Sequence, residues 1–183
     1  MPPFTYAAGP VALRRLCPAD LPAFAAYRAD PAVCRYQGFA PYTEAEAAAF
    51  LAGQAAAPVP PAPGQWTQLA IARVADDLLL GDCALHLLAD APDTAEIGIT
   101  LAAGWQGRGY AGAALRGLLG LCFAELKLRR VLALTDVRNA PCIGLLEAVG
   151  MRREGHFLAN GHYKGEWCDE YRYALLAQEW AAA

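Results

Sequence analysis

The residues best suited to chemistry run from Glu96 to Gly112, where a strand-like segment precedes a glycine-rich loop and an apolar helix. A loop that enters a helix leaves several backbone N–H groups without partners, and the helix dipole adds positive potential there. Such a site can bind a phosphate or pyrophosphate. Gly107, Gly109 and Gly112 carry no Cβ, so the backbone can approach an anion closely. Physical reasoning alone leaves an ordinary helix start as an equal alternative.

Two common nucleotide-binding motifs do not occur in this stretch. It lacks Gly-x-x-x-x-Gly-Lys-Ser/Thr, so no lysine is placed to hold a γ-phosphate. It also lacks Gly-x-Gly-x-x-Gly with an acidic residue about 20 positions later, because Glu125 falls at the end of the helix itself. The pattern therefore argues against a nucleotide hydrolase and against a dinucleotide-binding domain.

The order of residues in the loop points to a specific family. Residues 106–111 fit Gln/Arg-x-x-Gly-x-Gly/Ala, which is the acetyl-coenzyme A loop of the GNAT N-acetyltransferases. Residues 95–98 resemble the central strand of that family. Residues 139–142 and 146–151 resemble its Asn-x-x-Ser and Gly-Phe elements. The chain thus resembles a GNAT enzyme, and the resemblance implies acetyl-coenzyme A as co-substrate.

Within that family the chain is most similar to the RimJ/RimL branch. The segments that match the branch are 13–16 with Asp20, the turn at 29–31, and the closing segments 165–170 and 179–180. The resemblance covers nearly the whole chain, from about residue 11 to residue 180. It identifies the family more sharply than the acceptor.

The resemblance implies how the co-substrate would be held. Two parallel central strands would splay at one end, and the pantetheine arm would lie in the gap against backbone groups. The pyrophosphate would lie on N–H groups of the loop, where Arg108 either adds a charge-assisted contact or is only solvated. The cofactor-binding residues implied are Ile97, Ile99, Leu101, Gln106, Gly107, Arg108, Gly109, Tyr110, Ala111, Gly112 and Asn139.

The catalytic groups are less clearly marked. An amine must lose a proton before it attacks, and Glu96 could take that proton through water or be only a structural carboxylate. The tyrosine that the family often carries in the helix after Asn139 is replaced by Leu146. Cys142 stands at the family's serine position near a helix N-terminus, where a thiol pKa tends to fall and the thiolate becomes reactive. Cys142 is either the acid for the departing sulfur or a small packed residue.

The acceptor site of the family is walled by two helices and the loop between them. The candidate acceptor contacts in that loop are Arg35, Tyr36, Gln37, Phe39 and Tyr42. The alternative for the aromatic residues is packing onto the core, and for Arg35 it is solvation. The histidines at positions 86, 156 and 162 fall in strand segments, where packed or exposed side chains are the simpler interpretation.

The elements needed to position these residues can be read from the sequence. Asp20 and the box Thr43–Glu46 predict helix starts, and Gly53 predicts a helix end. Gly81 predicts a bend or bulge, and the proline-rich segment 55–64 predicts an exposed loop. The expected strands are 11–16, 66–74, 79–88, 94–101, 131–135, 152–162 and 166–175, and the expected helices are 20–28, 44–53, 110–126 and 139–150. These predict a mixed, strongly twisted α/β sheet flanked by helices on both faces.

Composition sets the remaining limits. The 183 residues suit a single domain, 1–183 with a core of about 11–180. A membrane span needs about 18 consecutive apolar residues, and no apolar run is that long. Residues 1–5 do not resemble a signal peptide, so a cytoplasmic protein is expected. The six cysteines form no Cys-x-x-Cys pair and predict buried free thiols. The net charge of −3 argues against nucleic acid and permits a cationic amine.

The function expected from all this is acetyl-coenzyme A-dependent N-acetyl transfer to a primary amine. The acceptor would be a protein N-terminus, as in the RimJ/RimL branch, or a small amine. The alternative is a non-catalytic acyl-coenzyme A binder or sensor, which the missing tyrosine and the uncertain base would suit. No metal is expected, and a homodimer is allowed.

Overall fold

The computed structural model describes residues 4–181, so residues 1–3 of the segment 1–5, which was compared with a signal peptide above, lie outside this range. The strands form one eight-stranded sheet in the order β1-β2-β3-β4-β5-β6-β8-β7. The strands are β1 Thr5–Ala8, β2 Val11–Arg15, β3 Trp66–Arg73, β4 Leu79–Leu87, β5 Thr94–Leu101, β6 Arg130–Asp136, β7 Arg152–Tyr163 and β8 Glu166–Leu176. The α-helices are α1 Leu21–Arg28, α2 Pro31–Cys34, α3 Glu44–Ala55, α4 Tyr110–Gly120, α5 Ala140–Ala148 and α6 Ala177–Trp180.

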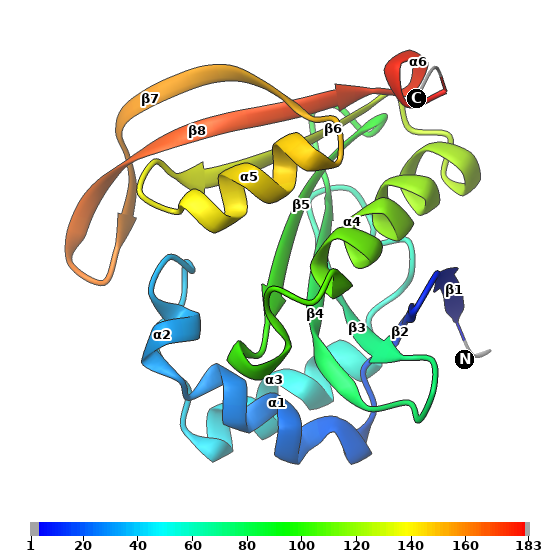
Figure 1. Ribbon diagram of the computed structural model, residues 1–183, viewed down its shortest axis with the longest axis vertical. Helices are drawn as coiled ribbons and strands as arrows, with labels where there is room; N and C mark the ends of the chain where they lie inside the picture. The colour runs from blue at the N-terminus through cyan, green and yellow to red at the C-terminus, as the bar shows by residue number, and fades with distance from the viewer. Residues whose placement is uncertain (1–3, 182–183) are drawn as a thin grey trace.

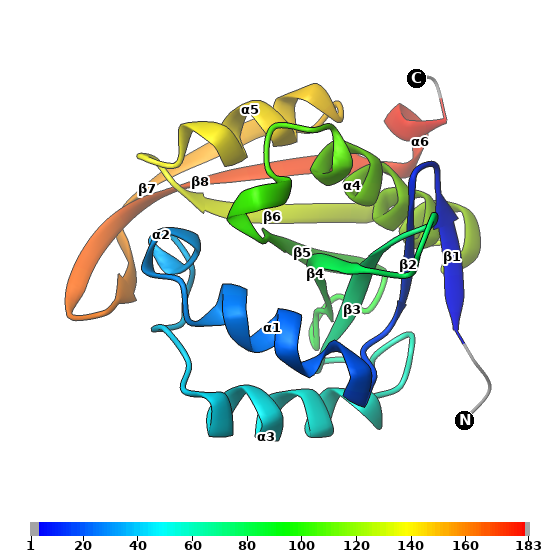
Figure 2. The same cartoon turned by 60° about the horizontal axis from the view of Figure 1, so that its bottom comes forward.

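Helices cover both faces of this sheet, as predicted (Figure 1). In Figure 2, α1 and α3 lie below the sheet while α4 and α5 lie above it. A separate apolar cluster fills each interface: Phe24 and Leu51 are buried on the first side, and Leu115 and Leu118 on the second. Within residues 4–181, none of the helices has the length and apolar character that crossing a bilayer requires.

The strands around the predicted site agree closely with expectation. β5 spans the predicted residues, and β3 and β4, which lie within the predicted strands 66–74 and 79–88, pair as an antiparallel hairpin. The predicted bulge is present, because Ile71 pairs with Gly81 while Ala72 pairs with Leu79. A Cβ on Gly81 would stand 2.1 Å from the carbonyl oxygen of Thr100, so only glycine allows this close approach of the strands.

Four helix ends differ from the prediction in position or capping, one of them the end of α5, which lies at Ala148 rather than Gly150. α3 continues to Ala55 past Gly53, because a glycine inside a helix costs only about 1 kcal/mol and does not by itself end it. α4 ends at Gly120, and Leu121–Glu125 continues it as a wider π-helical turn. Asp20 precedes α1 but does not cap it, because its carboxylate accepts from the Arg14 guanidinium and from the Cys17 N–H instead.

Among the short elements that were not predicted are β1, α2 and the closing helix α6. β1 is four residues long and pairs with β2 through a turn at Gly9, which is too short a segment for an alternating pattern to be visible. α2 begins at Pro31, the last residue of the expected turn at 29–31. The Asp30 carboxylate accepts from the Ala32 N–H at 2.8 Å, and proline is tolerated in the first helical turn. α2 starts the loop that carries the predicted acceptor residues.

Candidate active site

The two parallel central strands separate along their length, as predicted. β5 and β6 pair only from Thr94 with Arg130 to Glu96 with Leu132. β6 continues to Asp136 but is paired there with β8, while β5 continues to Leu101 and is paired with β4. A gap therefore opens between the two strands beyond Glu96.

Backbone groups of β5 face this gap. The carbonyl oxygen of Ile99 accepts a hydrogen bond from the Gln37 amide at 3.3 Å, and that of Leu101 accepts one from the Gln106 amide at 2.9 Å. Because backbone groups of alternate residues point to the same side of a strand, Ile97 shares this direction. The strand edge can therefore bind an extended, amide-bearing ligand such as the pantetheine arm.

The glycine-rich loop has the conformation that an anion site needs. Gly107 and Gly109 have φ angles of 71° and 83°, in the left-handed region that favours glycine. Gly109 precedes α4, and its carbonyl accepts from the Ala113 N–H. The N–H groups of Tyr110, Ala111 and Gly112 lie in the first turn, where a helix has no internal acceptors for them. The positive end of an 11-residue helix is thus presented at the loop.

Two side chains of the loop are engaged within the protein. Gln106 ties the loop to the end of β5 through the Leu101 carbonyl. The guanidinium of Arg108 lies 5.1 Å from the ring centre of Trp105, and that of Arg73 lies 4.8 Å from the same ring. Gln106 therefore has a structural contact, and the contact of Arg108 with the cofactor stays a prediction.

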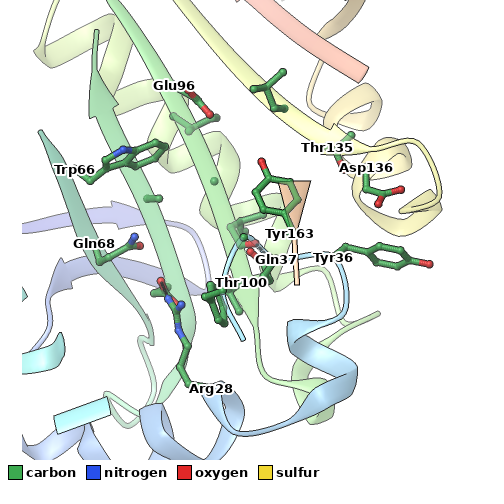
Figure 3. Close-up of a pocket in the computed structure, with 18 of the residues that line it drawn as sticks. Arg28, Tyr36, Gln37, Trp66, Gln68, Glu96, Thr100, Thr135, Asp136 and Tyr163 are labelled. Carbon is green, nitrogen blue, oxygen red and sulfur yellow. Dashed lines mark hydrogen bonds and ion pairs between the residues drawn. The ribbon is translucent and has the colours of Figure 1, made fainter. Parts of the chain in front are cut away.

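A cavity of about 390 Å³ lies between the gap, helices α1 and α3, and the loop between α2 and α3 (Figure 3). β5 forms its central wall, with Glu96 and Arg28 toward opposite ends in the figure. Its aromatic lining residues are Tyr36, Phe39, Tyr42, Phe50, Trp66 and Tyr163, and its charged ones are Arg28, Asp82, Glu96, Asp136 and Glu170. Acidic groups outnumber basic ones, so the cavity suits a cationic ligand.

Most of the charged groups in this cavity already have partners. Arg28 and Asp82, both almost fully buried, form an ion pair at 2.5 Å, and the Tyr27 hydroxyl donates to Asp82 at 2.8 Å. The Arg28 guanidinium also lies 4.1 Å from the ring centre of Phe39. Removing one member of such a buried pair typically costs about 3–5 kcal/mol, so this pair fixes the floor of the cavity.

Glu170 and Asp136 are held at the other side of the cavity. The Glu170 carboxylate accepts from the Tyr163 hydroxyl at 3.1 Å and from the Asn160 amide at 2.5 Å. A Cβ on Gly161 would stand 2.4 Å from the Tyr163 ring, so glycine there lets the hairpin bring both donors to Glu170. Asp136 is paired with Arg138 at 2.7 Å.

Glu96 differs from these groups because no partner is found for it among the described residues. Its side chain is half-buried. Burial raises the pKa of Glu96, and the negative charge of Glu170 raises it further. Of the four carboxylates in this cavity, Glu96 is therefore the one available to bind an ammonium group or accept its proton.

A smaller cavity of about 80 Å³ lies on the other side of the gap, against α4 and α5. Leu115, Asn139, Cys142 and Leu146 line it. The two cavities share the wall residues Tyr36, Gln37, Ile97, Gly98, Ile99, Leu134 and Thr135. The gap between the strands thus joins an acceptor-sized cavity to a narrow one that contains Cys142.

The environment of Cys142 corrects one prediction. Asn139 caps α5 as expected, because its side-chain oxygen accepts from the Cys142 N–H at 3.3 Å. Burial nevertheless raises the pKa of the Cys142 thiol, with a hydrogen bond to Thr135 acting in the opposite direction. The predicted fall in pKa was wrong, since the loss of water around the sulfur has the largest effect on the thiol and disfavours the thiolate.

The predicted acceptor residues divide into two groups. Tyr36, Gln37, Phe39 and Tyr42 line the large cavity. Arg35 is exposed and lies with its guanidinium 5.1 Å from the ring centre of Tyr36, outside that cavity. None of the three histidines lines either cavity, although His86 stacks under Trp66 with the ring centres 4.5 Å apart. The loop between α2 and α3 therefore does contribute to the site.

Several residues of the site were not predicted from the sequence. Asp82 carried a usable signal, because it is a lone acid within an otherwise apolar strand. Arg28 sits at the end of α1, where an exposed cation is usual. Tyr163 and Glu170 lie on a hairpin of mixed polarity that gave no local sign of which face would turn inward. Trp66 likewise gave no sign of lining a site, because aromatic residues are common in strands.

Comparisons with known proteins agree with this geometry. The family model described as "Acetyltransferase (GNAT) domain" matches residues 11–152. The chain is 39% identical over 87 residues to the uncharacterized N-acetyltransferase YnaD and 34% identical over 105 residues to the candidate ribosomal N-acetyltransferase YdaF, both of Bacillus subtilis. These matches cover 48% and 57% of this chain and span only 51% and 57% of those two proteins.

The fold comparison covers more of the chain. A GNAT-family acetyltransferase from Bacillus anthracis superposes with a TM-score of 0.86 at 27% identity, over 96% of this chain and 99% of that one. The family model covers well over half of the sequence, and the splayed strands and the glycine-rich loop stand where the motifs predicted them. The chain therefore belongs to the GNAT family of acetyltransferases.

Proposed function

We propose that this protein transfers the acetyl group of acetyl-coenzyme A to a primary amine. The observation that carries the proposal is the opening between β5 and β6. It joins an acidic, aromatic cavity on one face of the sheet to a narrow cavity and an anion-binding helix start on the other. A thioester carbonyl held in that opening would be accessible to an amine from the large cavity.

The residues present fit the proposed co-substrate. Backbone groups of Ile97, Ile99 and Leu101 would hold the pantetheine arm. The Ile99 and Leu101 carbonyls already accept hydrogen bonds from the Gln37 and Gln106 amides, so both can accept a donor on this side of the strand. The N–H groups from Gln106 to Gly112 would hold the pyrophosphate, since an anion at a helix start is favoured by both hydrogen bonds and dipole. Bound there, acetyl-coenzyme A supplies the activated acetyl group.

Glu96 has the properties of the general base. An amine is mostly protonated at neutral pH, and a carboxylate of raised pKa is better matched to accept its proton than an ordinary one. The other acids of the cavity are engaged with Arg28, Arg138 or Tyr163. Glu96 would therefore attract the ammonium group, take its proton directly or through water, and leave the neutral amine to attack.

Cys142 is our candidate for the group that protonates the departing sulfur. It lines the narrow cavity at the gap, and its raised pKa keeps the thiol protonated at neutral pH. A protonated thiol is a donor, whereas the thiolate expected from the helix start alone would not have been one. Leu146, at the position of the family's frequent tyrosine, is buried and has no proton to give.

For the acceptor we propose a chemical class rather than a single compound. The similarity to YdaF, which is named as a candidate ribosomal N-acetyltransferase, supports a protein N-terminus and the RimJ/RimL branch. A small amine is the other acceptor class that the acidic cavity suits. Tyr36 and Tyr42 are the proposed acceptor contacts within the cavity, and Arg35 would contact an acceptor only outside it.

The cell context belongs to the same proposal. All six cysteines are unpaired, which suits a reducing compartment such as the cytoplasm. We further propose that residues 1–183 act as one domain, since both apolar clusters lie against the same sheet.

An acceptor screen that follows release of free thiol from acetyl-coenzyme A tests the proposal. The panel would contain N-terminal peptides and small amines, with acetyl-coenzyme A also tested for its effect on the melting temperature. We expect thermal stabilisation and thiol release with at least one amine. Stabilisation without release on any acceptor would instead support a non-catalytic acyl-coenzyme A binder, and absence of both would remove the proposal.

A further inference from the structure

The turn between β7 and β8 is fastened to the loop that follows α2. In Figures 1 and 2 the tip of this hairpin lies beside α2, although the two are far apart in sequence. The contact is made by Lys164, whose Nζ donates to the carbonyl oxygens of Cys34, Arg35 and Gln37 at 2.6, 3.1 and 3.0 Å. An ammonium group has three donors, so these contacts use all of them.

The turn geometry directs Lys164 toward this loop. Lys164 and Gly165 have φ angles of 52° and 84°, as in the tight hairpin turns that need two residues in the left-handed region. A lysine is an uncommon choice there, because a non-glycine residue is strained at positive φ. The three carbonyls that it contacts offset that strain.

The loop that Lys164 fastens reaches the centre of the site through Gln37. The backbone carbonyl of Gln37 accepts from Lys164, while its side-chain amide donates to the Ile99 carbonyl at 3.3 Å. Gln37 also lines both the large and the small cavity. A surface lysine and the strand edge at the gap are therefore connected through a single residue.

The residue before Lys164 makes the matching contact on the inner side. The Tyr163 hydroxyl donates to Glu170, and its ring lies 3.3 Å from where a Cβ on Gly38 would stand. Figure 3 shows Tyr163 beside Gln37 and Tyr36 at the cavity. The hairpin tip thus closes one side of the large cavity. Lys164 fastens the loop that follows α2, which forms another side of the cavity, to this tip.

We propose that Lys164 is a positioning residue for acceptor binding, which acts by holding residues 35–42 in place through Gln37. This inference rests on the proposed function for its kinetic readout only. Lys164 is exposed and touches no group proposed to react, so its removal should change acceptor affinity more than the chemical step. Acetyl-coenzyme A binding at the glycine-rich loop should be unaffected, because that loop lies on other elements.

The test compares Lys164→Asn with Lys127→Asn. Lys127 is the matched control, because it also has a positive φ, 54°, is exposed, and lies after α4, away from both cavities. Asparagine tolerates positive φ, so backbone strain stays similar in both variants. Hydrogen–deuterium exchange of amides 35–42 should rise about fivefold or more in Lys164→Asn and stay unchanged in Lys127→Asn.

Kinetics supply the second readout. With the best acceptor of the screen, Lys164→Asn should raise the acceptor KM about five- to tenfold and change kcat less than about threefold. The acetyl-coenzyme A KM should change less than the acceptor KM, because Ile99 alone of the backbone groups proposed to hold the pantetheine arm contacts Gln37. Gln37→Met should reproduce the rise in acceptor KM. The double variant should add little to either single one, because both act in one chain of contacts.

Each outcome either supports or overturns the positioning role of Lys164. Equal exchange of residues 35–42 in the two lysine variants overturns the inference, as does raised exchange with an unchanged acceptor KM. Were the wild-type protein to turn over no amine, the proposed function would fail, while the exchange comparison would still decide whether Lys164 holds this loop. Were Lys164→Asn to misfold, Gln37→Met would carry the kinetic comparison alone.

Discussion

The two halves of this site are built in different ways. The co-substrate half consists of consecutive residues on β5, the glycine-rich loop and the start of α4, and it acts mainly through backbone groups. The acceptor half is assembled from residues on α1, α3, the six strands β3 to β8 and the loop between α2 and α3. One half is therefore a local motif, and the other is a product of the tertiary fold.

This difference explains what each half can tolerate. Backbone contacts depend on φ and ψ and on the absence of a Cβ, so a few glycines control the first half. Side-chain contacts depend on residue identity, so the second half can change its ligand by substitution while the fold persists. We therefore expect changes in the loop to abolish binding altogether and changes in the cavity to alter rates and preferences.

The largest effect is expected from Gly109→Asp. The substitution puts a carboxylate against the proposed pyrophosphate site and a side chain on a residue with φ of 83°. Coenzyme A affinity should fall by about a hundredfold or more, or about 2.7 kcal/mol. The thermal shift at a fixed ligand concentration should then disappear, as calorimetry or a melting assay would show.

Gly9→Asp is the matched control for backbone strain. Gly9 also has a positive φ, 64°, lies in the β1–β2 turn, and has open space around its Cβ position. It should lower the melting temperature by a similar amount and keep the ligand-induced shift. An unchanged shift in Gly109→Asp would mean that coenzyme A binds elsewhere, and the contrast between the two halves would lose its basis.

The next effect is expected from Glu96→Gln. General acid–base catalysis typically contributes about 10²- to 10⁴-fold, so kcat/KM should fall by about a hundredfold or more. Coenzyme A binding should remain, because the neighbouring backbone is unchanged. Should activity stay within a few fold of wild type, Glu96 would be a structural carboxylate and the base would have to be sought in bulk solvent.

The pH profile sharpens this assignment. Glu96 must be ionised to accept a proton, so activity should be lost as pH falls through its pKa, which burial and Glu170 raise above the usual value for glutamate. Glu170→Gln removes a negative neighbour and can keep hydrogen bonds with Asn160 and Tyr163. It should lower the pKa of Glu96 and move the acidic limb to lower pH, with the plateau rate little changed.

A smaller effect is expected from Cys142→Ala, about tenfold in kcat, if the thiol protonates the leaving sulfur. Cys142→Ser should retain most activity, because a hydroxyl can also donate. Ala and Ser variants that behave alike would reduce Cys142 to a packing residue. Burial raises the thiol pKa, so when an added oxidant takes up the two electrons, a mixed disulfide with free coenzyme A should form slowly at neutral pH and faster as pH rises, contrary to the reactive thiolate first expected.

The same contrast between the halves shows what a sequence can reveal. β5, the loop, α4 and the Asn139 cap were predicted because each depends on residues close together in the chain. The pairing of Arg28 with Asp82 joins positions 54 apart, and that of Lys164 with the α2 loop joins positions about 130 apart. No local pattern encodes such contacts, since they depend on how distant elements pack.

Burial produced the one clear chemical error. The helix start next to Cys142 was visible in the sequence and predicts a lowered thiol pKa, whereas the packing of β6 and α5 around the sulfur raises it. The sequence showed the dipole, which is local, but not the exclusion of water, which depends on the whole fold. For Glu96 the same effect raises the carboxyl pKa and favours the proposed role.

The smallest effect is expected from Asn139→Ala, which tests where the two halves meet. Asn139 caps α5 through the Cys142 N–H and also lines the small cavity at the gap. Loss of a cap typically costs about 1 kcal/mol, so the melting temperature should fall by a few degrees in thermal denaturation. Asn139→Asp keeps a capping oxygen and should keep the stability, since a carboxylate is favoured at a helix N-terminus.

If Asn139 acts only as a cap, activity measured well below the melting temperature should stay near wild type in both variants. Activity that falls more than about fivefold in Asn139→Ala, with coenzyme A affinity falling in parallel, would instead assign Asn139 to the co-substrate half. If neither stability nor activity changes, the 3.3 Å contact does not stabilise α5 and the start of that helix is held by its packing alone.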